Sequence, residues 1–95
     1  SSQQQREVKV KISDETLRGS YANTLLVAHT AEEFVLDFIL TLPPQAVCNA
    51  RILIHPGHLK RVIQALQQNL ARYEAAHGTV AAAPDPGPGA IGFTN

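Results

Sequence analysis

The sequence predicts a small α+β domain in which about four mainly antiparallel strands precede one long amphipathic C-terminal helix and an irregular Pro/Gly-rich tail. Alternating apolar residues dominate the first half of the chain, one apolar stripe with helical spacing follows, and proline and glycine fill the end. A chain of 95 residues has room for one core. We therefore assign residues 1–6 to a flexible lead-in, 7–80 to a single domain and 81–95 to the tail.

Four segments carry the alternation that is typical of half-buried strands: 8–12, 21–28, 34–42 and about 50–55. Residues 29–33 are few enough for a hairpin connection, so the second and third segments are expected to pair antiparallel. Pro43 and Pro44 end the third segment because proline gives no amide hydrogen to a strand ladder.

The long helix is predicted to begin at Pro56 and to end at Gly78, two positions that suit these residue types. Its apolar residues recur at spacings of three and four: Leu59, Val62, Ile63, Leu66, Leu70 and Tyr73. About twenty residues give a helix of roughly 30 Å, which is longer than a small sheet needs for its cover. Part of the stripe is therefore expected to be available to a second subunit.

Both faces of the third predicted strand carry apolar residues. Phe34, Leu36, Phe38, Leu40 and Leu42 form the main row, and Val35 and Ile39 lie on the opposite face. One helix covers only one side of a sheet, so the second side is a candidate subunit contact. We expect a homo-oligomer, a dimer or higher, with these interaction residues: Val35, Ile39, Leu59, Val62, Leu66, Leu70, Tyr73, Ile91 and Phe93.

Composition narrows the classes of function. Eight basic and eight acidic residues give a formal net charge of +0, which disfavours a general polyanion binder. Cys48 is the only cysteine and no apolar leader segment is present, so we expect a cytoplasmic protein without disulfides. The most apolar stretch, 34–42, contains Asp37 and is too short to span a bilayer, so no membrane partner is expected.

The sequence has few residues suited to binding a metal ion or to nucleophilic catalysis. His55 and His58 are three apart, with Cys48 or His29 as a conceivable third ligand, but no pair completes a recognisable ligand set. Cys48 has no catalytic signature around it and is expected to serve as a small hydrophobe. We therefore predict no metal, no cofactor and no enzymatic activity.

Asp37 interrupts an apolar strand and has two interpretations. It is either half of a carboxylate pair with Glu32 or Glu33, suited to acid–base chemistry, or a residue that points to solvent or pairs with Arg51 on a neighbouring strand. The second interpretation is favoured. Gly87 and Gly89 do not make a phosphate-binding loop, because proline between them removes an amide.

Several short motifs keep a characteristic order along the chain: Tyr21-Ala22-Asn23, Glu33 to Phe38, Pro43, Arg51-Ile52, Pro56, Lys60, Leu66, Tyr73-Glu74 and Gly78. In this order and spacing, residues 8–80 resemble a family of small bacterial and archaeal proteins known as domain of unknown function number 3467. The resemblance implies a prokaryotic protein and assigns no activity. The Pro/Gly-rich tail lies outside the pattern.

The leading hypothesis is a non-catalytic interaction or assembly module that acts as an oligomer and binds another protein. The strand order is also similar to that of SecB-like chaperones, so a holdase for extended polypeptide is the first alternative. A single-stranded nucleic-acid binder is the second, using basic and aromatic side chains. Its candidates are Lys9, Lys11, Lys60, Arg61 and Arg72 with Tyr21, Phe34 or Phe38.

Overall fold

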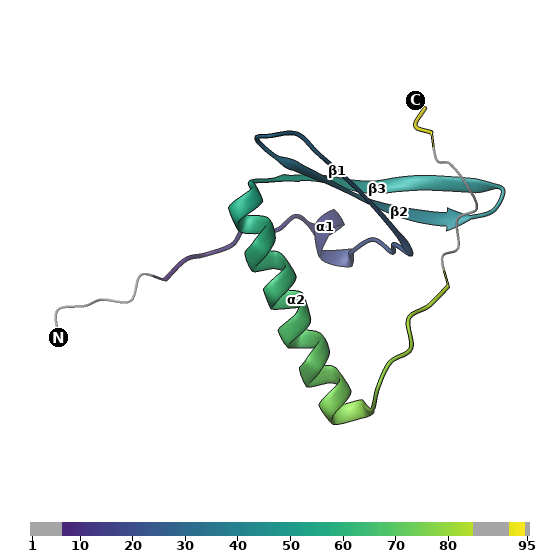
Figure 1. The fold of residues 1–95 in the computed structure, drawn as a ribbon. Helices are drawn as coiled ribbons and strands as arrows, with labels where there is room; N and C mark the ends of the chain where they lie inside the picture. The colour runs from purple at the N-terminus through teal and green to yellow at the C-terminus, as the bar shows by residue number, and fades with distance from the viewer. Residues whose placement is uncertain (1–6, 85–91, 95) are drawn as a thin grey trace.

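The fold is α+β, with an antiparallel sheet and a long C-terminal helix as expected (Figure 1). The computed structural model describes residues 7–84 and 92–94. Its elements are α1 (Asp14–Arg18), β1 (Thr24–His29), β2 (Phe34–Leu42), β3 (Gln45–Ile54) and α2 (Pro56–His77). The strands form one sheet in the order β1-β2-β3. Residues 1–6 of the predicted lead-in and 85–91 of the predicted tail lie outside the described part.

The predicted strand at 8–12 is not confirmed: the described residues contain one sheet of three strands, and 8–12 is not part of it. Residues 7–12 run away from the sheet without joining it (Figure 1). Val8 and Val10 are 81% and 83% exposed. The alternating pattern is suited to a strand, but a strand also needs a neighbouring edge, and this segment pairs with none of the three described strands.

Helix α1 was not predicted. Ser13 caps it by accepting a hydrogen bond from the Thr16 amide at 3.2 Å, and Gly19 ends it at φ +76°. Asp14 and Glu15 in the first turn favour the helix through its dipole. Five residues are too few for an apolar periodicity, so only the cap signalled this helix.

Strands β1 and β2 form the predicted antiparallel hairpin, with His29 opposite Phe34 and Thr24 opposite Ile39. Strand β1 begins at Thr24 instead of the predicted Tyr21, and the Asn23 amide just before it donates a hydrogen bond to the Ile39 carbonyl at 3.0 Å. The Asn23 side chain accepts a hydrogen bond from the Thr41 amide at 2.8 Å and donates one to the Thr41 carbonyl at 3.0 Å.

Strand β3 starts at Gln45, five positions before the predicted start at Ala50. It follows β2 directly after Pro43-Pro44, and its register contains a bulge: Phe38 pairs with Ala50, whereas Ile39 pairs with Cys48. Asn49 has no opposite residue. Because of this extra residue, the alternation of the two sheet faces shifts by one position at Asn49. The pattern before Ala50 therefore does not continue the pattern after it, and the first half of β3 was not predicted.

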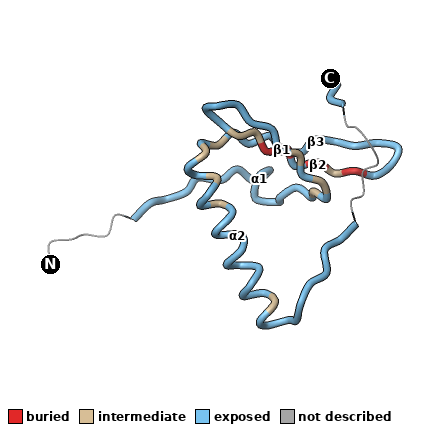
Figure 2. The backbone as a smooth tube through the Cα atoms, in the orientation of Figure 1, coloured by how far each residue is buried: buried red, intermediate tan, exposed pale blue. Residues whose placement is uncertain are grey.

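Helix α2 extends away from the sheet (Figure 1) and makes only sparse contact with the other elements. The buried part of the described chain is confined to β2 (Figure 2). Only two apolar side chains are buried there, Leu36 at 8% and Ile39 at 2% exposure. The chain therefore folds around a very small core.

Candidate interaction surface

The apolar stripe of α2 is uncovered over most of its length. Leu59 and Val62, next to the sheet, are half-buried, but farther along the helix the stripe is exposed, with Leu66 at 66%. The exposed members are Ile63, Leu66, Leu70 and Tyr73. Within residues 7–84 and 92–94, the distal half of the predicted contact stripe thus stays exposed, with the His77 ring of the same helix 4.8 Å from that of Tyr73.

The face of the sheet that carries the predicted main row is only partly covered: Leu36 is buried and α1 lies beside Phe38 and Ala50, but other apolar side chains are exposed. Register places Leu25 opposite Phe38, Val27 opposite Leu36, and Leu36 opposite Ile52, so these side chains share one face. Its exposed large apolar residues are Leu25, Val27, Phe38, Leu42, Val47 and Ile52. We call them, together with the exposed stripe of α2, the open apolar surface.

The opposite face is the one on which Val35 and Ile39 were predicted as contacts. Val35 is half-buried and Ile39 is almost fully buried. A small hollow of about 110 Å³ joins Ile39 and Cys48 to Gly92–Thr94, so the tail lies over this face. Ile91, the other predicted tail contact, falls outside the described residues. The contact roles of Val35, Ile39 and Phe93 stay predictions, but Ile39 is not accessible in the chain as folded.

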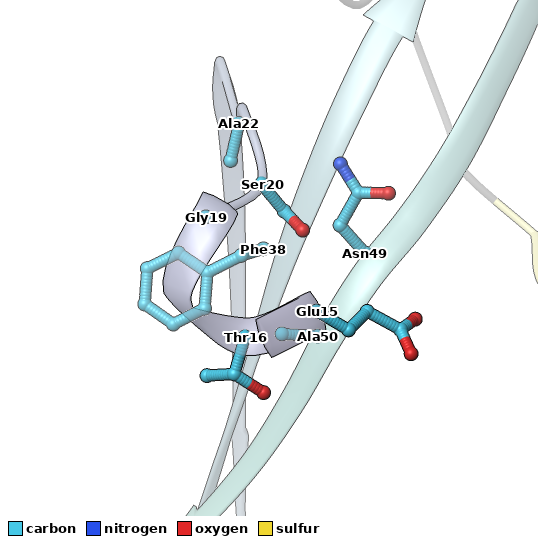
Figure 3. A pocket seen from close by; sticks show the side chains of 8 residues that line it. All are labelled: Glu15, Thr16, Gly19, Ser20, Ala22, Phe38, Asn49 and Ala50. Carbon is cyan, nitrogen blue, oxygen red and sulfur yellow. The ribbon is translucent and has the colours of Figure 1, made fainter. Parts of the chain in front are cut away.

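A pocket of about 440 Å³ lies between α1 and the sheet (Figure 3). Phe38 and Ala50 supply its apolar lining, and Glu15, Thr16 and Asn49 supply polar groups. The Asn49 amide nitrogen also donates a hydrogen bond to the Tyr21 carbonyl at 2.6 Å, which ties the connection after α1 to β3. The lining includes neither a histidine nor a cysteine.

Asp37 and Arg51 form the ion pair that the sequence favoured. Arg51 Nε donates to Asp37 Oδ1 at 2.7 Å, and Nη2 donates to Oδ2 at 3.0 Å, a bidentate geometry across β2 and β3. Asp37 is buried instead of facing solvent, and the Arg51 guanidinium lies 5.3 Å from the centre of the Phe93 ring. The hydrogen bond from Arg51 holds the pKa of Asp37 below its usual value, against the opposing effect of desolvation.

This lowered pKa predicts how acid acts on the protein. A carboxyl group whose pKa is lower in the folded than in the unfolded state stabilises the fold above its unfolded pKa of about 3.9, and this contribution is lost as pH falls through the folded pKa. Arg51→Met removes the cause of the shift, so its acid-unfolding midpoint is expected at higher pH than the parent's, followed by circular dichroism. Arg72→Met, an exposed arginine on α2, is the control and should leave the midpoint unchanged. Equal midpoints for the parent and Arg51→Met would contradict a stabilising pair.

The histidines near the start of α2 are engaged in separate local contacts. His55 is the N-cap of the helix, and its Nδ1 accepts a hydrogen bond from the Gly57 amide at 2.9 Å. His58 Nδ1 lies 3.1 Å from Arg61 Nη2. Within residues 7–84 and 92–94, no three His, Cys, Asp or Glu side chains gather in a way that would hold a metal ion. Cys48 is exposed on β3.

No helix within the described segments combines the length and the apolar character that crossing a membrane would require.

Comparison with known proteins adds one match. The family model described as "Protein of unknown function (DUF3467)" matches residues 1–82, which include every helix and strand described above. No curated protein and no solved structure matches the chain.

Proposed function

Because the chain belongs to the DUF3467 family, whose description assigns no activity, we propose its function from its surfaces: it is a small non-catalytic interaction module that works as a homo-oligomer. The observation that carries this proposal is the open apolar surface, above all the uncovered stripe of α2. In proteins, most of the stability of a helix comes from packing its apolar face. Among the described residues, α2 has such packing only near its start, at Leu59 and Val62.

The accessible surface area of the chain is larger than that of a compact monomer. The chain exposes 8790 Å², whereas a compact monomer of its mass is expected to expose about 5,400 Å². The extended residues 7–12 and 79–84 contribute to this difference, together with the open apolar surface.

A second copy of the chain is the occupant that fits this surface best. Each copy has both an exposed helical stripe and an exposed sheet face, so two copies related by a two-fold axis can place α2 of one on the sheet of the other. A net charge of +0 also means that two copies do not repel each other by overall charge. The resulting dimer would bury apolar area that neither copy covers alone, and leave the outer surfaces for a protein partner.

The proposal is tested by light scattering together with an aggregation assay. We expect the purified protein to scatter as at least two chains of 10.3 kDa and to leave the aggregation of a denatured client protein unchanged. Suppression of that aggregation would show that the open apolar surface accepts extended polypeptide, which replaces the proposal with a SecB-like holdase. If the purified protein scatters as a folded single chain, the homo-oligomer proposal is wrong.

A further inference from the structure

We propose that residues Val8–Ile12 add as a fourth strand to the free edge of β1 in a second copy of the chain. This inference rests on the self-association proposed above and names a segment and a receiving edge for it. The segment has the composition of a half-buried strand, with Val8, Val10 and Ile12 on one side and Lys9 and Lys11 on the other. In its own chain all three apolar side chains are exposed and the segment leads away from the sheet (Figure 1).

The sheet offers two free edges, because it is open and its order is β1-β2-β3. An edge strand presents unpaired amide and carbonyl groups, and proteins guard such edges with charges, prolines or bulges. Strand β3 carries two of these features, Arg51 and the bulge at Asn49. Strand β1, with the sequence TLLVAH, has no proline, no bulge and no Lys, Arg, Asp or Glu. The unguarded edge is therefore β1.

Length and charge favour the same edge. The five residues of the segment match the six residues of β1. If the apolar row of the segment continues the exposed row of Leu25 and Val27, the lysines fall on the other face, beside Leu26 and uncharged neighbours. The same placement on β3 continues the row of Ile52 and Ile54 but sets the lysines on the face of Arg51, and like charges side by side destabilise a sheet.

Pairing between copies also accounts for the strand pattern that finds no neighbour within one chain. An added strand gives β1 hydrogen-bonding partners on both sides and extends the open apolar surface by the side chains of Val8, Val10 and Ile12. The exchange is reciprocal in a two-fold dimer, since each copy donates one segment and presents one β1 edge.

Disulfide trapping between different chains tests this pairing. All variants carry Cys48→Ser, which removes the only native cysteine. The donor chain is enlarged by a tag and bears one cysteine in the segment: Val8→Cys, Val10→Cys or Ile12→Cys. The acceptor chain bears Val27→Cys on β1. In the matched control the acceptor bears Ile52→Cys on β3 instead, and both positions are exposed on the same sheet face. The two chains are refolded together and oxidised, and the mixed disulfide is read from its size on a non-reducing gel. Three donor positions are needed because a disulfide forms only at Cβ separations of about 3.5–4.5 Å.

For at least one donor position we expect the mixed disulfide with Val27→Cys to exceed that with Ile52→Cys by about tenfold, since paired strands hold the thiols at a much higher effective concentration than chance encounters do. The proposal is overturned if Ile52→Cys traps as much or more, if disulfides form only between two donor segments, or if none of the three donor positions is trapped. Light scattering on the same samples separates the two levels of inference. Dimers without the β1 disulfide refute the strand addition alone, whereas folded single chains refute the self-association as well.

Discussion

Lysine in place of Leu66 is expected to dissociate the protein into single chains and to remove most of the helical signal of α2. Leu66 is 66% exposed in one chain, so in a monomer the change would fall within the ±0.5 kcal/mol that is usual for surface substitutions. In the proposed dimer the same side chain lies against the second copy. The variant then loses the burial of a leucine, about 1.5–3 kcal/mol, and must desolvate an ammonium group, which costs several kcal/mol more.

Gln67→Lys is the matched control, because it places the same charge one residue along the helix, outside the apolar stripe. Light scattering and far-ultraviolet circular dichroism measure both variants at the same concentration. We expect Gln67→Lys to keep the mass and helicity of the parent. If Leu66→Lys also keeps them, the stripe of α2 contacts nothing in solution.

The second large effect is expected at Ile39, the most deeply buried side chain of the described chain at 2% exposure. Ile39→Ala leaves a cavity against β1 and β3, and such changes cost about 2–5 kcal/mol. That is a large fraction of the stability of about 5–15 kcal/mol that is common for single domains. The urea-unfolding midpoint of Ile39→Ala should therefore fall well below that of the parent.

Val80→Ala controls for the loss of apolar atoms at an exposed position beyond α2. Its unfolding midpoint should stay close to that of the parent. Equal midpoints for the parent and Ile39→Ala would mean that the small core around β2 does not hold the sheet together.

The elements that sequence reasoning located best are those whose signals are local. The hairpin of β1 and β2 follows from two alternating runs and a short connection, and α2 follows from Pro56, Gly78 and an apolar stripe between them. The start of β3 was missed because the bulge at Asn49 breaks the alternation. Helix α1 was missed because five residues give no period.

For the candidate site, local sequence patterns do not predict which apolar residues become covered. Apolar residues line both faces of β2, and periodicity alone does not say which face is covered. The tail at Gly92–Thr94 lies over the face of Ile39, while Phe38 and Leu42 on the other face stay exposed. The Asp37–Arg51 pair was found because the two residues are on neighbouring strands, but the burial of Asp37 depends on neighbours far away in the sequence. Residues 8–12 have the pattern of a strand whose partner is, by our inference, in another chain.

The dependence of folding on association is tested most directly by sedimentation equilibrium over a dilution series, with circular dichroism recorded on the same samples. The open apolar surface leads us to expect a mass of at least twice 10.3 kDa wherever helix and sheet are present, with mass and structure lost together at the lowest concentrations. A 10.3 kDa species that retains the full circular dichroism signal on dilution would contradict the account.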